Sequence, residues 1–386
     1  MKVFSKWFLV SCICALAGCV PAFACTTALV SSGASSNGRP MIWKQRDTAY
    51  EFSVLKHVRD GKYEFTAIFD AKDTALASAY AGVNEKGFAI INNLSYNLSG
   101  CDCSRSNGTL MRLALATCAD VDDFLSLVGS FPVPRSFEAN FGVADRNGNL
   151  CYIEIGDVSV ERYDVPDNGW LVRSNYSLSG RENEGKGFAR YRTAEALMSK
   201  HKGKFSADYL FDTVSRSFYN EVLKTDVSKR NRKGMAVDLD FIPRTTSVCS
   251  ICIEVPRQDE AENSALIWCS TGYPLGAYAV PVWQCAGDNI PSFLSSTADD
   301  IRSASSVLSQ RIKNMLHPLE RDASGIYIDF SLALPVIKLV RKYERTEYEY
   351  GLELDRKLRK GSFDKSLISK YNSEAEQRFV SFYNSF

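Results

Sequence analysis

A short apolar segment ends in Ala22-Phe23-Ala24, and a cysteine, Cys25, follows it directly. Signal peptidases require small residues at the first and third positions before the cut, because their pockets there admit little more than a methyl group. Residues 1–24 also carry lysines at their start and a proline just before the small residues, as signal peptides do. We therefore expect residues 1–24 to be a signal peptide, Cys25 to begin the mature chain, and the protein to be exported, periplasmic or secreted.

A cut before Cys25 would give that residue a free α-amine, whose ordinary pKa of about 7.7–8 suits a general base near neutral pH. A terminal cysteine or threonine activated by its own amine is an established form of nucleophile. The chain holds only three histidines, and His57, His201 and His317 all read as isolated surface residues. None lies beside a nucleophile or in a metal-ligand pattern, so the sequence predicts neither a histidine-activated nucleophile nor a metal site or cofactor.

A second motif competes with the signal-peptide reading. Leu16-Ala17-Gly18-Cys19 has the form of a bacterial lipobox, in which Cys19 is lipidated and becomes the new N-terminus. Cys25 would then be internal unless the chain cut itself again before that residue. The sequence leaves both routes open, and a membrane partner is expected only if Cys19 is lipidated.

Composition excludes other classes of function. Lys and Arg total 46 against 45 Asp and Glu, so the net charge of +1 gives no electrostatic footprint for nucleic acid. After the first 25 residues no apolar run approaches the roughly 20 residues of a membrane helix. We expect a small-molecule substrate and no nucleic-acid partner, and the sequence leaves a homo-oligomer open.

The number of cysteines also favours Cys25 as a reactive residue. Twelve cysteines are present, and removing the three in residues 1–24 leaves nine, an odd number that favours one unpaired reactive thiol. Cys249 and Cys252 have the spacing of half a zinc site, but no second pair completes it. Their apolar setting predicts buried core thiols instead.

A hairpin is expected to follow Cys25. Residues 26–30 and 40–44 read as strands, and the turn-forming cluster between them ends in Asn37-Gly38. Antiparallel pairing would return the chain to the level of Cys25 at residues 44–47. Lys44, Arg46 and Asp47 are therefore expected near the thiol, and a polar strand end in solvent is the alternative.

Two further apolar strands run into asparagines. Residues 88–91 lead into Asn92 and Asn93, and residues 170–173 are followed by Ser174 and Asn175. A buried amide without partners costs about 1–3 kcal/mol, so its presence needs a reason. One reason is donation to a developing oxyanion, and the alternative is a turn cap.

The rest of the chain adds helices. Apolar spacing predicts helices over residues 109–118, 120–128 with Asp120 as N-cap, 188–200 and 205–219. The highly charged tail, residues 343–386, is expected to form solvated peripheral helices without chemistry.

Taken in order, these motifs resemble one family. Cys25-Thr26-Thr27, followed by Lys44-Gln45-Arg46-Asp47, resembles the N-terminal-nucleophile (Ntn) hydrolases. The most similar group is the acyl-coenzyme A:6-aminopenicillanate acyltransferase family of linear amide hydrolases, relatives of choloylglycine hydrolases. The stretches AGVNEKGFAIINN, EANFGVADRNGNLCYIE, LVRSNYSLSGR and IPRTTSVCSICIE continue the resemblance to about residue 283.

The resemblance implies an α+β fold, a four-layer αββα sandwich of two antiparallel sheets. Residues 25–290 would form the catalytic domain, and residues 291–386 a helical C-terminal extension packed on the same domain. The implied reaction is cleavage of a linear, non-peptide C–N amide bond, or transfer of its acyl group, through a thioester. Hydrolysis and transfer differ only in the final acceptor.

The resemblance also implies roles for particular residues. Cys25 is similar to the nucleophile and Asp47 to the aspartate that orients the mature N-terminus. Asn93 fits the oxyanion-hole asparagine, with Asn92 one residue away, and Asn175 is similar to the second asparagine of the site.

The cations of the site are less settled. Lys44 stands where choloylglycine hydrolases carry an arginine, three residues before the aspartate, and Arg46 is adjacent. Which of the two stabilises the thiolate stays open. Arg244 corresponds to a late-chain arginine of these families.

Two other functions remain under consideration. One is a lipidated surface-binding protein, anchored through Cys19, whose hydrolase-like fold is inactive. The other is a dipeptidase of a related group that also begins Cys-Thr-Thr, but that group continues with asparagine, glutamate and aspartate where this chain has Gln45-Arg46-Asp47-Thr48.

Overall fold

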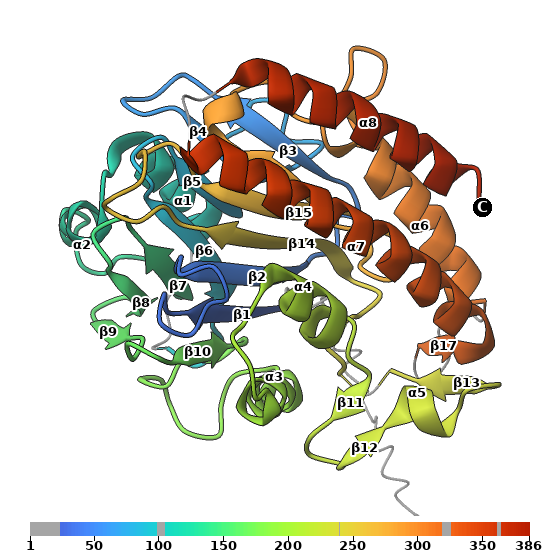
Figure 1. Ribbon diagram of the computed structural model, residues 1–386. Helices are drawn as coiled ribbons and strands as arrows, with labels where there is room; N and C mark the ends of the chain where they lie inside the picture. The colour runs from blue at the N-terminus through green and yellow to red at the C-terminus, as the bar shows by residue number, and fades with distance from the viewer. Residues whose placement is uncertain (1–23, 99–104, 239, 319–325, 361–363) are drawn as a thin grey trace, which may run out of the picture.

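The computed structural model describes residues 24–98, 105–238, 240–318, 326–360 and 364–386 (Figure 1). The expected signal peptide, apart from its last residue, and the lipobox with Cys19 lie outside the described residues. Two antiparallel sheets stacked face to face form the centre of the molecule.

The first sheet has six strands in the order β10-β1-β2-β14-β15-β16. Their bounds are β1 Cys25–Val30, β2 Met41–Asp47, β10 Trp170–Arg173, β14 Ser247–Glu254, β15 Leu266–Thr271 and β16 Val280–Trp283. β1 and β2 are the expected hairpin, and Gly38 in its turn has a φ of 75°, a conformation that favours glycine.

The second sheet has seven strands that follow one another in chain order from β3 to β9. Their bounds are β3 Ser53–Val58, β4 Phe65–Asp70, β5 Ala81–Asn84, β6 Ala89–Leu94, β7 Ala139–Ala144, β8 Leu150–Ile155 and β9 Val160–Asp164. Two small ribbons lie apart from these sheets: β11 Tyr219–Asn220 with β12 Thr225–Asp226, and β13 Met235–Val237 with β17 Tyr327–Asp329.

Glycine allows the two sheets to approach closely. A Cβ atom added at Gly142 on β7 would lie 2.9 Å from Leu29 of β1 and 2.9 Å from Ile91 of β6. Such a distance is shorter than van der Waals contact, so a larger residue there would push the sheets apart. With the sheets this close, Thr27 in the first half of β1 bonds to Asn93 of β6, next to the site described below.

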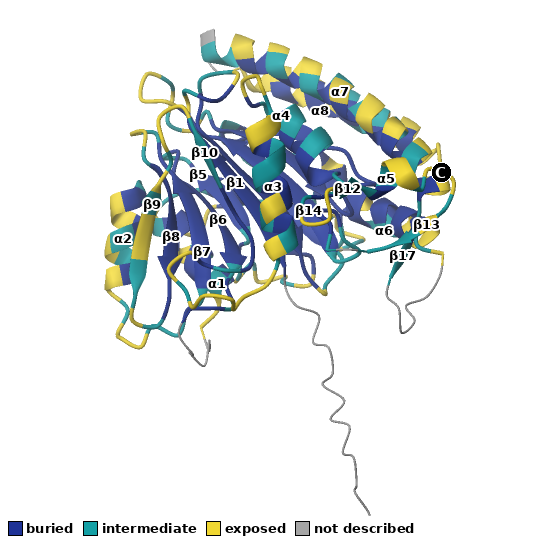
Figure 2. Cartoon of the chain, turned by 90° about the horizontal axis from the view of Figure 1, so that it is seen from below, coloured by how far each residue is buried: buried dark blue, intermediate teal, exposed yellow. Residues whose placement is uncertain are grey.

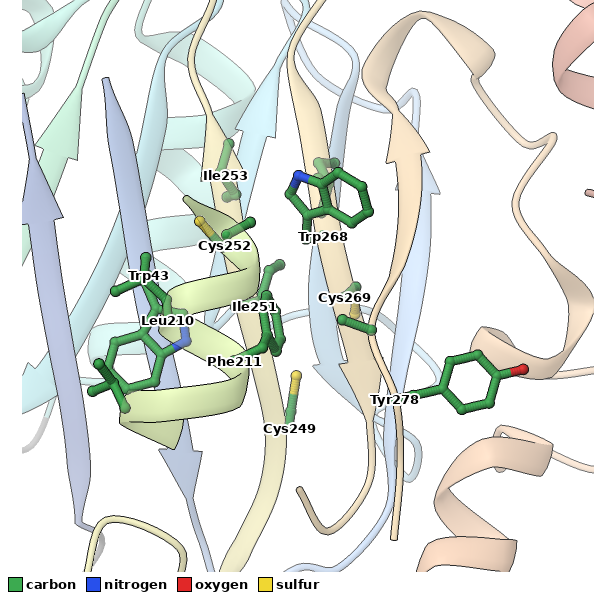
Figure 3. Packing of buried hydrophobic residues seen from close by; sticks show 14 of the residues in the cluster. Trp43, Leu210, Phe211, Cys249, Ile251, Cys252, Ile253, Trp268, Cys269 and Tyr278 are labelled. Atoms are coloured by element: carbon green, nitrogen blue, oxygen red, sulfur yellow. The ribbon is translucent and has the colours of Figure 1, made fainter. Parts of the chain in front are cut away.

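Helices cover both outer faces of the sandwich (Figures 1 and 2). α1 (Asn107–Thr117) and α2 (Val121–Gly129) pack on the seven-stranded sheet. On the six-stranded sheet lie α3 (Phe188–Lys200), α4 (Ala207–Tyr209), a π-helix (Leu210–Ser215) and α7 (Phe330–Lys360). Leu210 and Phe211 of the π-helix pack in the same buried cluster as Trp43 and Ile251 (Figure 3). The expected four-layer αββα, α+β fold is confirmed.

Three further helical segments complete the chain. α6 (Ala304–Leu316) closes one end of the sandwich, because Ser303 and Ser306 donate to the carbonyl of Ser53 on β3 while Ser305 donates to that of Thr271 on β15. α8 (Lys365–Tyr383) packs on α7. The short segments are α5 Val227–Arg230 and the 3₁₀ turns Gln284–Ala286 and Ser292–Leu294.

Two sequence expectations about helices had different outcomes. Asp120 caps α2 as predicted, since its side chain accepts from the backbone N–H of Asp123. The helix expected over residues 205–219 ends at Ser215 instead. Ser215 donates to Gln45 on β2, and Arg216 turns away to pair with Glu344 on α7, so the chain leaves the helix early.

The expectation of a solvated C-terminal tail is wrong. Glu344, Glu347 and Asp355 are buried, because each meets a partner inside: Glu344 pairs with Arg216 at 2.6 Å and Glu347 with Arg378 at 2.6 Å. The many charged residues of the tail predicted that it would face solvent, whereas these buried charges are paired with charges of opposite sign. The domain boundary near residue 290 stays a prediction.

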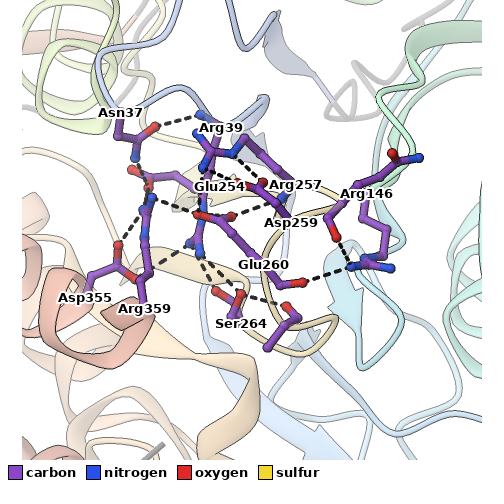
Figure 4. A network of polar contacts seen from close by, with 12 residues as sticks. Asn37, Arg39, Arg146, Glu254, Arg257, Asp259, Glu260, Ser264, Asp355 and Arg359 are labelled. Carbon is purple, nitrogen blue, oxygen red and sulfur yellow. Dashed lines mark hydrogen bonds and ion pairs between the residues drawn. The ribbon is translucent and has the colours of Figure 1, made fainter. Parts of the chain in front are cut away.

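Asp355 belongs to a buried charged network that ties α7 to the β1–β2 hairpin (Figure 4). Arg359 contacts Asp355 at 2.5 Å, and Arg39 contacts Glu260 at 2.7 Å. Glu254 lies between them and accepts from Trp268 and Asn37. Burial raises the pKa of Glu254 to about 7, and the charge of Asp355 adds to the shift.

Candidate active site

Cys25 is the first residue of β1, and the register of the hairpin fixes its neighbours. Cys25 pairs with Arg46 and Thr27 with Lys44. Because side chains alternate along a strand, Cys25, Lys44 and Arg46 share the face of the first sheet that meets the second. Cys25 is a free thiol that is 7% exposed.

The thiol borders a cavity of about 460 Å³. The structure brings five of the sequence-predicted residues to this cavity: Cys25, Lys44, Arg46, Asp47 and Asn92. The remaining wall includes polar, aromatic and apolar side chains, namely Thr48, Ala49, Tyr50, Asp70, Lys72, Tyr80, Leu94, Arg105, Ser106 and Asn107. Asn93, Asn175 and Arg244 do not line it.

Lys44 is a buried cation without a carboxylate partner among the described residues. Its Nζ donates to the carbonyl of Tyr80 at 2.8 Å and to Oδ1 of Asn92 at 2.7 Å. Burial lowers the pKa of Lys44 to about 8, while the charge of a Cys25 thiolate opposes that shift. The ammonium is therefore available to stabilise a negative charge on the thiol.

The charge of Arg46 is already paired with a carboxylate. Its guanidinium pairs with Asp70 at 2.8 Å, donates to Ser53 at 3.2 Å and stacks on the ring of Tyr80 at 3.8 Å. Because Asp70 already balances this charge, the geometry favours Lys44 over Arg46 as the cation that stabilises the thiolate. The sequence alone left that choice open.

The two adjacent asparagines of β6 lie in different surroundings. Asn92 borders the cavity, and its Nδ2 donates to no other side chain or backbone group in the described chain. Asn93 is fully buried: its Oδ1 accepts from Thr27, and its Nδ2 faces the carbonyls of Cys25 at 3.3 Å and Arg173 at 3.4 Å. Asn92, rather than Asn93, thus presents an amide donor to the cavity.

Asn175 follows β10 and holds the backbone of Cys25. Its Oδ1 accepts from the backbone nitrogen of Cys25 at 2.9 Å, and its Nδ2 donates to the carbonyl of Leu94 at 2.8 Å. Both ends of the amide are therefore fixed. This nitrogen is the atom that would become the α-amine after a cut before Cys25.

Asp47 ends β2 with one carboxylate oxygen bonded and the other free. Oδ1 accepts from Ser247 at 2.5 Å, whereas Oδ2 is buried and has no hydrogen-bond partner among the described residues. Burial raises the pKa of Asp47 to about 6, although Arg244 and Arg190 oppose the rise. Arg244 itself bonds to Asp240 at 3.1 Å.

Arg190 on α3 was not singled out by the sequence, and it contacts the site directly. It donates to the carbonyl of Cys25 at 2.7 Å and to Oδ1 of Asn175 at 2.9 Å. A signal was present: Arg190, Ala194 and Met198 recur every four residues, so Arg190 falls on the buried face of its helix.

Histidines do not border the cavity, and the expectation that they are surface residues is wrong for His57, whose side chain is 1% exposed and bonds to Glu64. The described residues contain no group of three or more His, Cys, Asp or Glu suited to a metal ion. They also contain no helix both long and apolar enough to cross a membrane.

Cys249 and Cys252 are buried free thiols, as expected.

A family model described as acyl-coenzyme A:6-aminopenicillanic acid acyl-transferase matches residues 48–222. This region of the chain is similar to that acyl-transferase family. The match confirms the Ntn-hydrolase resemblance and the expected enzyme class, hydrolases and acyltransferases of linear amide bonds. Asn92, Asn175 and Arg190 lie inside the matched acyl-transferase region, whereas Cys25 precedes it.

Solved structures with low sequence identity also resemble the chain. A Caenorhabditis elegans ortholog of N-acylethanolamine-hydrolyzing acid amidase is 16% identical, with 59% of this chain and 91% of that chain covered and a TM-score of 0.41. A mutant conjugated bile acid hydrolase from Clostridium perfringens is 14% identical, with 67% and 92% covered and a TM-score of 0.40. Penicillin V acylase from Agrobacterium tumefaciens is 12% identical, with 67% and 86% covered and a TM-score of 0.40. No curated protein matches the chain.

Proposed function

We propose that the protein is an exported amide hydrolase or acyltransferase whose nucleophile is Cys25, made N-terminal by removal of residues 1–24. The observation that carries the proposal is the placement of Cys25. Its side chain borders the cavity beside Lys44 and Asn92, while its backbone nitrogen is held by Asn175. A nucleophile and its own base would thus be fixed on one residue.

The first step is attack of the Cys25 sulfur on the carbonyl carbon of the substrate amide. The α-amine takes the thiol proton, and the S–C bond forms as the carbonyl π electrons move to oxygen. Lys44 stabilises the thiolate, because its ammonium is buried beside the thiol and unpaired with any described carboxylate. Asp47, whose buried Oδ2 has no hydrogen-bond partner among the described residues, accepts a hydrogen bond from the amine and so orients it.

The tetrahedral oxyanion then needs a donor inside the cavity. The free Nδ2 of Asn92 is suited to this role, and one such donor typically contributes about 2.7–4 kcal/mol to transition-state stabilisation. As the oxyanion collapses, the C–N bond breaks and the amine leaves with the proton held by the α-amine. A thioester between the acyl group and Cys25 remains.

Water or a second amine resolves the thioester and restores the thiol. The cavity of about 460 Å³, walled in part by Tyr50, Tyr80 and Leu94, has room for an acyl group of moderate size. The acceptor decides between hydrolysis and transfer, and it binds to the same acyl-enzyme in both reactions.

The test is turnover of a panel of penicillin V, conjugated bile acids, N-acyl amino acids and short β-alanyl amides. Cys25→Ala should abolish the activity found with wild type, and Cys25→Ser should be much slower, since a hydroxyl is a poorer nucleophile. Cys285→Ala, which removes a half-buried thiol that does not line the cavity, should leave activity unchanged. Turnover by folded Cys25→Ala would contradict the proposal.

Localisation forms part of the proposal. Export with cleavage after Ala24 produces the active N-terminus, whereas lipidation of Cys19 leaves Cys25 internal until a second cut. An active protein that still carries a lipidated Cys19 would refute the α-amine mechanism, because Cys25 would then have no free amine.

A further inference from the structure

Arg190 makes four hydrogen bonds from its single guanidinium. Nη1 donates to the carbonyl of Cys25 at 2.7 Å and to Oγ1 of Thr26 at 3.2 Å. Nη2 donates to Oδ1 of Asn175 at 2.9 Å, and Nε donates to Asp240 at 3.0 Å. Three of these bonds end on Cys25, its neighbour, or the residue that holds its nitrogen.

The structure holds this guanidinium in one place. Arg190 is 1% exposed, and Asp240 bonds to its Nε while the two Nη atoms bond to Cys25, Thr26 and Asn175. Gly187 lies against it with a φ of 77°, and a Cβ atom there would fall 2.2 Å from Nη2. Only glycine leaves room for Arg190 at this position, so the loop before α3 is fitted to the side chain.

The positive charge of Arg190 lies close to the Cys25 nitrogen that would become the α-amine. Asn175 Oδ1 accepts from both the Cys25 nitrogen and Arg190 Nη2, each at 2.9 Å, so these two nitrogens are neighbours around one oxygen. A like charge within about 4–6 Å disfavours the protonated form of an amine and lowers its pKa. An amine with an ordinary pKa of about 7.7–8 would otherwise be mostly protonated at neutral pH.

We propose that Arg190 is a positioning residue that holds Cys25 at the mature N-terminus and keeps its α-amine in the unprotonated form that takes the thiol proton. This inference rests on the proposed function. Arg190 acts through the amine and does not touch the substrate, since it does not line the cavity.

Other charged groups on the surrounding elements lie near Cys25 and Arg190. Asp47 at the end of β2 favours the protonated amine, whereas Lys44, on the same strand, disfavours it. The segment before β14 contributes Arg244 and Asp240, and Tyr96 after β6 contributes a phenol. Arg46 is balanced by Asp70. Among these groups, Arg190 is the one bonded to both Cys25 and the acceptor of its nitrogen.

The experiment compares pH profiles of kcat/KM for wild type, Arg190→Gln, Arg190→Lys and the control Arg192→Gln. Arg192 lies on the same helix, is exposed and pairs with Glu195. Removing the charge in Arg190→Gln should move the acid limb of the profile up by about 1 pH unit. Arg190→Lys keeps the charge, so its acid limb should stay in place while kcat/KM falls through lost positioning. Arg192→Gln should match wild type.

A direct titration does not depend on the variants folding. In mature wild type labelled with ¹⁵N-cysteine, the Cys25 amine should titrate below about 7.7, the lower end of its ordinary range. Titration at or above that value would overturn the inference, as would an unshifted acid limb in Arg190→Gln. If Cys25→Ala is inactive while the acid limb stays unshifted, only the role of Arg190 fails. If Cys25→Ala remains active, the proposed function itself fails.

Discussion

Lys44 donates to Oδ1 of Asn92 over 2.7 Å, and this bond fixes which end of the Asn92 amide is left for the cavity. With the oxygen occupied by an ammonium, the nitrogen is the free end. An amide donor and a buried cation thus lie together beside Cys25. Both stabilise negative charge, one on the oxyanion and the other on the thiolate.

Asn92→Ala is expected to lower kcat by about 10²- to 10³-fold, the usual effect of losing one oxyanion donor. Asn93→Ala should instead lower the free energy of unfolding, because Asn93 joins Thr27 and the carbonyl of Cys25 inside the sandwich. Steady-state kinetics and urea unfolding of both variants separate the two roles. A larger loss of kcat in folded Asn93→Ala than in Asn92→Ala would reverse the assignment.

Asp47→Asn is expected to reduce kcat/KM at least about tenfold, because an amide cannot match a carboxylate as acceptor for the charged amine. Ser247→Ala removes the bond to Oδ1 of Asp47 and the acceptor for the backbone N–H of Arg244, but it keeps the carboxylate, so its effect should be smaller. Initial rates at neutral pH on the same substrate measure the difference. Equal activity of Asp47→Asn and wild type would contradict the role of the free oxygen.

Glu254→Gln is expected to change how stability depends on pH. Burial, with the charge of Asp355, raises the pKa of Glu254 from 4.5 to about 7, so the folded state binds this proton more tightly than the unfolded state. Wild type should therefore lose stability relative to Glu254→Gln as pH rises from about 4.5 to 7, by about 3 kcal/mol at about 1.4 kcal/mol per pH unit.

Urea unfolding across this pH range measures the effect. Glu353→Gln is the matched control, because Glu353 lies on α7 close to Asp355 but is exposed and pairs with Lys357. That control should run parallel to wild type. A constant difference between wild type and Glu254→Gln from pH 4.5 to 7 would show that Glu254 titrates normally.

The hairpin and the residues it returns to Cys25 were readable from the sequence, because the turn at Asn37-Gly38 and the alternation of the strands fix the register. Which of Asn92 and Asn93 presents its amide to the cavity could not be predicted from the sequence. Adjacent residues on a strand face opposite sides, but which side meets the cavity depends on how β6 of the second sheet packs on the first sheet, whose Lys44 lies 48 residues earlier in the chain.

Buried charged residues were the other feature that the sequence did not predict. Glu344 was expected in a solvated helix and Arg190 was not singled out, since a sequence shows charges but not the partners that allow them to be buried. Arg190 meets Asn175 and Asp240, and Glu344 meets Arg216, each across a large separation in the chain. Pairing of this kind becomes visible only once the fold is known.

The proposed mechanism requires Cys25 to be both N-terminal and acylated. Intact-mass analysis and peptide mapping of the exported protein, quenched in acid during turnover, measure both properties at once. We expect a chain that begins at Cys25 and an acyl group, labile to hydroxylamine, on that residue alone. An active chain that retains residues before Cys25, or an acyl group carried on another residue, would contradict it.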